Sequence, residues 1–451
     1  MLKHLLSALK KKPQPALPPS APADPRVAKV VAAHHAFQAQ YAALEQPARA
    51  ADAPLQTMMD FAQACFELEL DSECEDALKR VLARDPDNPQ AHYALALLIS
   101  NFARFAEAES HLRQALARAP NDINVRFAMT MNLLARNRYA EGHRMFRVRM
   151  EGPSHPAPHI AALPAWAGEP LAGKTLVLWS DWGGLGDDIA YGRFVRGIRA
   201  TCHPARLIVA VPRPLRRFFA VQSYVDEVVD LADEVQADLQ CGLIESANIL
   251  GITFETLPSW PSVFEVPAPD LQYWRTQLRH EPRLKVGLAW TTTSVPPIDL
   301  GRVGRADKHL PDTALALLCG VPGMVFVSLQ KGAHIAKAAD LLPGAAVIDD
   351  TDDLHDFIDT AALMRQLDLI VTIDTGVAHL AGALGVPTLV LLRKGRGYFW
   401  PEARSDTPWY PSVRMVVQEQ VRDWESVLLR TRAVLQRRAA GVPWPECFDR
   451  T

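Results

Sequence analysis

The feature that most restricts the fold is a series of short apolar runs, rich in valine, isoleucine and leucine, with segments of helical length between most of them. Such runs are expected for strands buried on both faces of a parallel sheet. They lie at residues 175–180, 207–211, 225–231, 285–290, 324–329, 369–373 and 388–392. The alternation predicts an α/β fold with two doubly wound units, at residues 155–278 and 279–425, joined by a charged hinge at residues 275–283.

A second pattern precedes these runs. Residues 83–86 (ARDP) align with residues 117–120 (ARAP) at an offset of 34, and the repetition extends over about residues 55–154. A period of 34 is typical of the helix-turn-helix tetratricopeptide repeat, so we expect an all-α solenoid here, with a recurring position filling the seam between helices: Leu78, Leu112 and Phe146. The module would either dock an acceptor or protein partner, or serve as a scaffold packed against its neighbour.

The ends of the chain are predicted to be simpler. Residues 1–54 combine a tail, a tether and a lead-in helix, because residues 13–25 hold six of the 35 prolines and proline disfavours both helix and sheet. Residues 426–451 are predicted to form a C-terminal helix.

Composition excludes several classes of protein. Lys and Arg number 48 against 51 Asp and Glu, which leaves no basic excess for nucleic acid. Six scattered cysteines without a C-x-x-C pair predict neither a zinc cage nor a disulfide framework and favour a reducing compartment. No run of about 18 apolar residues predicts a membrane-spanning helix. We therefore expect a cytoplasmic protein, with a peripheral position at the inner membrane face as the alternative.

A glycine turn, Trp182-Gly183-Gly184-Leu185-Gly186-Asp187-Asp188, follows the first run. Doubly wound sheets bind ligands at the carboxyl ends of their strands, and glycines there let the backbone approach a ligand. The turn therefore predicts a binding edge that includes Asp187. The alternative is a tight turn in which Asp187 or Asp188 caps the next helix.

A second turn follows the run at residues 369–373. Thr375 and Gly376 are expected to open a helix whose free N–H groups and positive dipole end would receive a diphosphate without a metal. Asp374 precedes this helix start and His379 lies one turn inside the helix. For His379 alone, a packed histidine bonded to a carbonyl is the competing interpretation.

A third segment, residues 302–311 (RVGRADKHLP), is expected at the same end of the second sheet. Arg305 and Lys308 would supply the positive charge that stabilises a departing diphosphate. The alternative is a solvated charged loop.

These residues carry a resemblance. Residues 374–387, with residues 328–332 (SLQKG) and 409–412 (WYPS), resemble glycosyltransferase family 9, the heptosyltransferase-like group. Residues 168–174 (GEPLAGK) followed by residues 184–187 (GLGD) are similar to the subgroup in which tetratricopeptide repeats precede the transferase. The resemblance implies a GT-B architecture, with two Rossmann-like lobes facing each other across an activated sugar. It also implies metal-independent transfer with inversion.

The resemblance also implies roles for single residues. Asp187 becomes the general base for the acceptor hydroxyl, in a glycine turn that includes Gly184 and Gly186, and Lys308 assists the leaving group. The donor would be held by Asp374, Thr375, Gly376, His379, Gln330 and Arg305. No metal or cofactor is expected beyond the nucleotide-sugar co-substrate, and the acceptor would be a glycan, a lipid-linked molecule or a protein.

The sequence thus predicts a repeat-bearing glycosyltransferase that uses a nucleotide sugar. A base for the incoming hydroxyl and positive charge for the outgoing diphosphate meet the chemical needs of such a transfer, whereas a glycoside hydrolase would need two carboxylates flanking the bond. The alternative is a noncatalytic interaction scaffold that keeps the transferase fold and binds a partner through its repeats.

Overall fold

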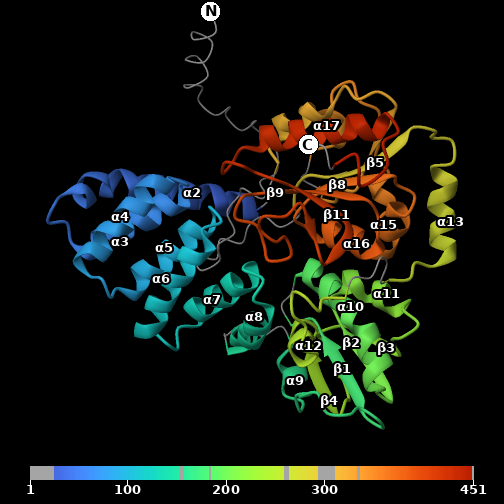
Figure 1. The fold of residues 1–451 in the computed structure, drawn as a ribbon, viewed down its shortest axis with the longest axis horizontal. Helices are drawn as coiled ribbons and strands as arrows, with labels where there is room; N and C mark the ends of the chain where they lie inside the picture. The colour runs from blue at the N-terminus through green and yellow to red at the C-terminus, as the bar shows by residue number, and fades with distance from the viewer. Residues whose placement is uncertain are drawn as a thin grey trace, which may run out of the picture.

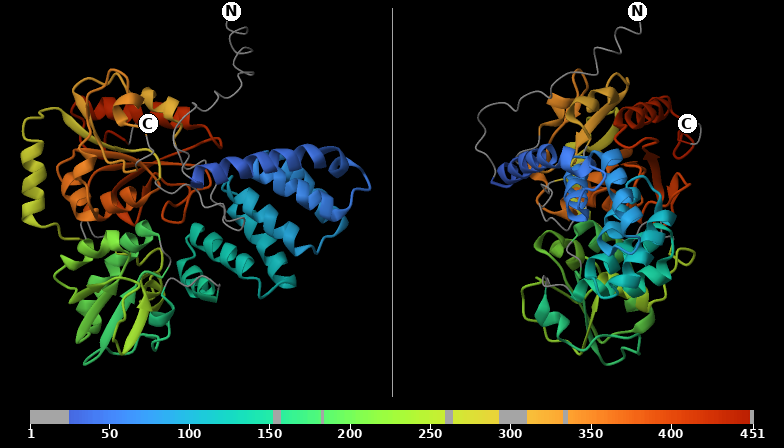
Figure 2. Two further views of the ribbon diagram at one scale, coloured as in Figure 1. Left: turned by 180° about the vertical axis from the view of Figure 1, so that it is seen from behind. Right: turned by 90° about the vertical axis from the view of Figure 1, so that its left-hand side faces the viewer.

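The computed structural model describes residues 25–151, 157–181, 184–258, 264–292, 310–332 and 336–448. These residues form a helical array and two α/β lobes, and the array lies beside both lobes (Figure 1). A view from behind and a view from the side show the same three parts (Figure 2).

The helical array has the period that the sequence predicts. It begins with α2 (Pro25–Arg49) and continues in three helix pairs: α3 (Leu55–Glu67) with α4 (Asp71–Arg84), α5 (Pro89–Ser100) with α6 (Phe105–Arg118), and α7 (Ile123–Ala135) with α8 (Tyr139–Met145). Corresponding helices begin 34 residues apart. A left-handed residue recurs in the turn of each pair at the same spacing: Glu69, Ala103 and Asn137. The array is consistent with repeats, and its assignment to the tetratricopeptide class stays a prediction.

Side chains repeat with the backbone. Leu78, Leu112 and Phe146 are all buried, as the seam position requires. Ion pairs recur as well, since Arg104 bonds to Glu75 and Glu107, and 34 residues later Arg138 bonds to Glu109 and Glu141. The repeated sequence therefore specifies repeated contacts and not only repeated helices.

The first lobe contains a four-stranded parallel sheet in the order β3-β2-β1-β4. The strands are β1 (Thr175–Trp179), β2 (Arg206–Ala210), β3 (Glu227–Val229) and β4 (Leu239–Gly242). Leu176 and Leu178 belong to the core that contains α10, whereas Val177 and Trp179 belong to a cluster with α9 on the other face. Its helices are α9 (Pro158–Ala161), α10 (Leu185–Cys202), α11 (Arg213–Ala220) and α12 (Leu243–Ile249), and the 3-10 helix η1 (Phe146–Glu151) leads into it.

The second lobe contains a seven-stranded sheet in the order β10-β11-β9-β8-β5-β6-β7, parallel except for the antiparallel pair β10 and β11. The strands are β5 (Leu284–Ala289), β6 (Met324–Ser328), β7 (Val347–Ile348), β8 (Leu369–Ile373), β9 (Thr388–Leu392), β10 (Asp406–Thr407) and β11 (Tyr410–Val417). The helices are α14 (Ala338–Leu341), α15 (Phe357–Met364), α16 (Gly376–Leu384) and α17 (Trp424–Ala439), with 3-10 helices η3 (Asp312–Leu318) and η4 (Thr351–Asp353). Clusters of buried side chains cover both faces of this sheet.

All seven predicted strands form, and four further strands were missed. β7 and β10 are only two residues long, β4 carries a glutamine and a glycine, and β11 contains Pro411, so none is a plain apolar run.

The C-terminal helix α17 ends at Ala439, earlier than predicted, because the chain turns at Gly441, whose φ is +90°. Part of the predicted hinge is helical, since α13 (Ala268–Gln277) connects the lobes.

The three parts share one hydrophobic core, which includes residues of α8, α10, α15 and α16. At its centre Trp409 Nε1 donates to the Tyr139 hydroxyl at 2.7 Å, and that hydroxyl donates to the carbonyl of Tyr398 at 3.0 Å. Across from them, His143 Nε2 lies 3.0 Å from the Tyr191 hydroxyl. The array is therefore fixed to both lobes through the α8 helix.

A buried ion pair adds a second link between the array and the first lobe. The side chain of Arg149, in η1, contacts the carboxylate of Asp181 at the end of β1, and both side chains are almost fully buried. Asp181 also accepts from the N–H groups of Ile244 and Glu245, at the start of α12. One carboxylate thus joins the array to a strand and a helix of the lobe.

We expect Arg149→Ala to destabilise the fold strongly, because it leaves the buried Asp181 charge without its guanidinium. Removal of one partner of a buried pair costs about 3–5 kcal/mol, measured by denaturant unfolding. Arg118→Ala, which removes an exposed pair with Asp87, is the control and should shift the midpoint little. Equal shifts in the two variants would show that the Arg149 pair is not a stabilising link.

Candidate active site

A cavity of about 870 Å³ lies where the two lobes meet. Its walls come from the carboxyl ends of both sheets, where the α10 start follows β1 and the α16 start follows β8. Figure 1 shows α10 and α11 along the edge of the first lobe that faces α15 and α16. Met131 and Phe146 of the helical array also line the cavity, so all three parts contribute to it.

The structure brings most of the predicted site residues together. Those that line the cavity are Gly184, Gly186, Asp187, Gln330, Asp374, Thr375, Gly376 and His379. Arg305 and Lys308 lie outside the described residues.

Helices α10 and α16 begin opposite each other. A Cβ atom built on Gly186 would lie 2.7 Å from His379 Cδ2 and 3.4 Å from Gly376 Cα, so only a glycine allows this approach. The N-cap residues of the two helices, Gly184 and Thr375, make no side-chain cap hydrogen bond. Because a helix start carries free N–H groups and the positive end of the dipole, two such starts make this region favourable for an anion.

Asp187 and Asp188 point in different directions. Asp187 lines the cavity and accepts a hydrogen bond from the Tyr398 hydroxyl at 3.1 Å. Asp188 is fully buried and accepts from Ser180 Oγ at 2.7 Å. Burial raises the pKa of Asp188 well above its usual range, and the charges of Asp181 and Asp187 raise it further, against the bond from Ser180. The N-cap residue of α10 is Gly184 and not Asp187 or Asp188, and of these two carboxylates it is Asp187 that borders the cavity.

His379 and Asp374 are held by aromatic side chains. His379 Nδ1 lies 2.9 Å from the Tyr410 hydroxyl, and its ring stacks on Trp400 with centroids 5.4 Å apart. Trp400 Nε1 donates to Asp374 Oδ1 at 2.8 Å. His379 Nε2 is 3.9 Å from the same oxygen. His379 is packed among aromatic rings, but its ring nitrogen bonds to a hydroxyl and not to the carbonyl of the competing interpretation, and its ring borders the cavity.

The side chain of Gln330 bonds to the backbone at the end of β5. Its side-chain carbonyl accepts from the N–H groups of Trp290 and Thr291, both at 3.0 Å, and so fixes the end of β5. Thr291 and Thr292 line the cavity and lead into residues 293–309, the segment that includes Arg305 and Lys308. Gln330 therefore orients the chain at the point where this segment begins.

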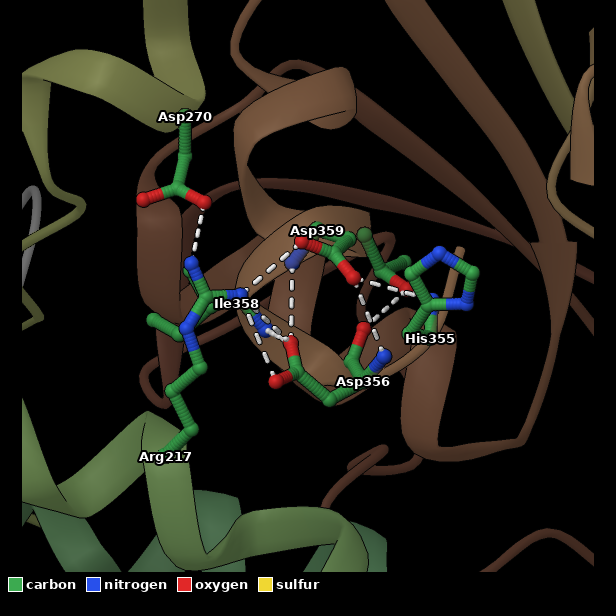
Figure 3. Close-up of polar contacts among 7 residues, drawn as sticks. Arg217, Asp270, His355, Asp356, Ile358 and Asp359 are labelled. Atoms are coloured by element: carbon green, nitrogen blue, oxygen red, sulfur yellow. Dashed lines mark hydrogen bonds and ion pairs between the residues drawn. The ribbon is translucent and has the colours of Figure 1, made fainter. Parts of the chain in front are cut away.

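A charged cluster joins the lobes beside the cavity (Figure 3). Arg217 of α11 reaches the second lobe, where Nη1 lies 2.9 Å from Asp359 Oδ1 and 3.3 Å from Asp356, and it also contacts Asp270 of α13. Burial lowers the pKa of Arg217, but the hydrogen bonds to Asp270 and Asp359 and the charges of the nearby carboxylates outweigh this effect, so that the pKa lies above its usual value. Asp356 caps α15 through the N–H groups of Ile358 and Asp359, and it also lines the cavity.

Sequence reasoning missed the aromatic segment after β9. Tyr398 and Trp400 bond to Asp187 and Asp374, the two carboxylates assigned to the site. A signal was present, because Gly395 and Gly397 precede three consecutive aromatic residues at the carboxyl end of a predicted strand. Lys331, whose Nζ donates to the Thr351 carbonyl at 2.6 Å, is a further cavity residue without an assigned role.

Within the described ranges, no group of three or more His, Cys, Asp or Glu side chains is arranged to hold a metal ion. All six cysteines are free thiols. In the same part of the chain, no helix combines the length and apolar character needed to cross a bilayer.

Comparison with known proteins relates part of the chain to a family. Residues 355–426, which include the α16 start and the aromatic segment after β9, match glycosyltransferase family 9 (heptosyltransferase). Protein FlbA of Caulobacter vibrioides is 29% identical over 304 residues, which cover 61% of this chain and 48% of that protein. The chain thus spans about half the length of this curated relative.

Solved structures with similarity to the chain include two bacterial transferases. The glycosyl transferase family 9 protein from Veillonella parvula is 14% identical, with a TM-score of 0.41 over 56% of this chain and 88% of that one. The E. coli ADP-heptose lps heptosyltransferase II is 16% identical, with a TM-score of 0.40 over 58% and 99%.

We expect Gly186→Ala to destabilise the protein. The new methyl group would clash with the His379 ring, which Phe399, Trp400 and Tyr410 confine, and overpacking of this kind costs about 1–3 kcal/mol. Gly197→Ala is the matched control, because it lies on the same helix with no atom near its Cβ and should stabilise by about 0.5–1 kcal/mol. Unfolding midpoints that move in the same direction would contradict the close approach of the two helices.

Proposed function

We propose that this chain is a glycosyltransferase that moves a sugar from a nucleotide-sugar donor to a hydroxyl group of a glycan, a lipid-linked molecule or a protein. The observation that carries the proposal is one cavity that contains both Asp187 of the first lobe and the α16 start, which lies within the family 9 match. In this proposal the two lobes have a GT-B arrangement, with the donor bound to the second lobe and the acceptor to the first.

The donor's diphosphate would bind at the start of α16. The N–H groups of Gly376 and Val377 precede the first intrahelical bonds, and the glycine leaves room for phosphate oxygens beside them. Fixed dipoles of this kind need no metal ion, so we assign metal-independent binding. Arg305 and Lys308 would add the charge that stabilises the leaving diphosphate.

The acceptor would approach from the side of Asp187. In a single displacement, the acceptor oxygen attacks the anomeric carbon while its proton passes to the Asp187 carboxylate. The bond from that carbon to the diphosphate oxygen breaks at the same time, and the configuration inverts. Met131 and Phe146 give the acceptor an apolar wall from the helical array, which supports a role of the array in acceptor docking.

Replacement of Gly376 by valine should weaken nucleotide binding without unfolding the protein. A Cβ there would lie at ordinary contact distance from Phe357 and from the backbone nitrogen of Gly186, but the valine methyl groups would occupy the space beside the helix start. Calorimetry first identifies the nucleoside diphosphate that the wild-type protein binds. For that ligand we expect a tenfold or greater loss of affinity in the variant, about 1.4 kcal/mol of binding free energy, both in the presence and in the absence of a chelator. Asp187→Asn is the control that should keep the affinity. Wild-type affinity in folded Gly376→Val would remove this assignment.

Asp187→Asn should abolish most of the transfer. Asparagine is nearly isosteric but cannot take up the acceptor proton, and general-base catalysis contributes about 10²–10⁴-fold, so kcat should fall by that order. Release of nucleoside diphosphate from ADP-, GDP- and UDP-linked sugars, in the presence of cell glycans and proteins, measures the rate. Near wild-type turnover would exclude Asp187 as the base. A wild-type protein that binds no nucleotide would favour the noncatalytic scaffold.

A further inference from the structure

A set of hydrogen bonds connects the cavity to the helical array through Tyr398. The side chain of Tyr398 comes from the second lobe, is only 5% exposed and lines the cavity. Its hydroxyl donates to Asp187 Oδ1 in the first lobe, and its main-chain carbonyl accepts from the Tyr139 hydroxyl in the array. One residue of the second lobe thus bonds to both of the other parts of the molecule.

The contacts hold Tyr398 in one place. Its ring packs on Phe399 with centroids 4.3 Å apart, and its hydroxyl also hydrogen-bonds with the Tyr191 side chain of α10. Tyr191 is in turn 3.0 Å from His143 of the array. A phenol confined in this way can fix the carboxylate that it contacts, because a donor in a constrained geometry favours one rotamer of its acceptor.

The position of Tyr139 depends on the array. Tyr139 is the first residue of α8, is 1% exposed, and its hydroxyl accepts from Trp409 Nε1 while it donates to Tyr398. Both bonds need the hydroxyl, so a phenylalanine at this position would keep the packing of the ring and lose the link to Tyr398.

We propose that Tyr398 is a positioning residue for Asp187, and that Tyr139 of the helical array holds Tyr398 in place. This inference rests on the proposed function, because it concerns the orientation of its general base. It gives the array a part in the transfer step besides any role in acceptor docking.

The proposal has a chemical signature that a packing role lacks. A hydroxyl that donates to a carboxylate stabilises the ionised form, so its loss should raise the pKa of Asp187 and move the acid limb of the kcat profile to higher pH. The titratable groups around Asp187 stay in place in such a variant: Asp181, Asp188 and Tyr191 in the first lobe, and Asp374, His379 and Tyr410 in the second.

The test compares Tyr398→Phe with the wild-type protein, with ADP-, GDP- and UDP-linked sugars as probes and released nucleoside diphosphate as the readout. We expect kcat to fall about tenfold, as for the loss of one charge-assisted hydrogen bond, with nucleotide affinity unchanged. The acid limb should move to higher pH. In an Asp187→Asn background the same substitution should change kcat little, because the carboxylate that it positions is absent.

Tyr139→Phe tests the link to the array and should lower kcat in the same direction by a smaller factor. Tyr224→Phe is the matched control, because it also removes a buried tyrosine hydroxyl, bonded to Gln222 at 3.4 Å and outside the cavity lining, and it should keep the wild-type kcat. If Tyr398→Phe does not fold, the kcat and pH profile of Tyr139→Phe decide the question.

Two different outcomes would overturn the proposal. If Asp187→Asn loses turnover while Tyr398→Phe and Tyr139→Phe keep the wild-type kcat and pH profile, the positioning role is wrong and the proposed function stands. If the wild-type protein turns over none of the nucleotide sugars, the proposed function fails and the positioning role fails with it.

Discussion

The structure depends on an aromatic core at the junction of its three parts. Trp409 contacts Tyr139 of the array and Tyr191 of the first lobe, with ring centroids 6.1 and 5.3 Å away. Arg193, buried in the same core, donates from Nη1 to the Trp409 carbonyl at 2.6 Å. Because aromatic rings contribute large buried areas and prefer defined geometries, this core fixes the angle between the lobes and the place of the array. Burial also lowers the pKa of His143 to about 4, so this core histidine is neutral at physiological pH.

The shape of the cavity follows from that junction. Two helix starts meet at the interface because Gly186 carries no side chain, and their dipoles favour negative charge. Asp187 and Asp374 lie in the same field, and each is bonded to an aromatic donor from the segment after β9. The site therefore combines fixed positive dipoles with oriented carboxylates, and the first suit a diphosphate while the second suit a proton acceptor.

The features that the sequence predicted are those determined by local patterns of residues, such as strands and the repeat period. Period and apolar runs were sufficient for the 34-residue spacing, for all seven predicted strands and for the carboxyl edge of each sheet, where Asp187 and Gly376 lie. That the two edges face each other was implied only by the family resemblance. The sequence did not predict the contacts of Tyr398. Tyr398 and Asp187 are 211 residues apart in the chain, and no local pattern indicates that their side chains form a hydrogen bond. Gln330 was assigned to donor binding. In the structure its side-chain carbonyl accepts hydrogen bonds from the backbone just after β5. This contact depends on the pairing of β5 with β6, which a local sequence pattern does not show. Arg305 and Lys308 lie in the segment outside the described residues and stay predictions.

The two walls of the cavity come from different parts of the chain. Residues 355–426 cover the α16 start and the aromatic segment, which are the parts that would meet a donor. The opposite wall comes from the first lobe and from Met131 and Phe146, where residues outside that stretch determine the shape. In the proposed function the acceptor contacts this opposite wall, so substitutions there would change acceptor choice without altering the residues proposed to bind the donor. Tyr398 is the exception, because it belongs to the matched stretch and contacts Asp187, so a change in the array that displaces Tyr139 would reach the chemical step through it.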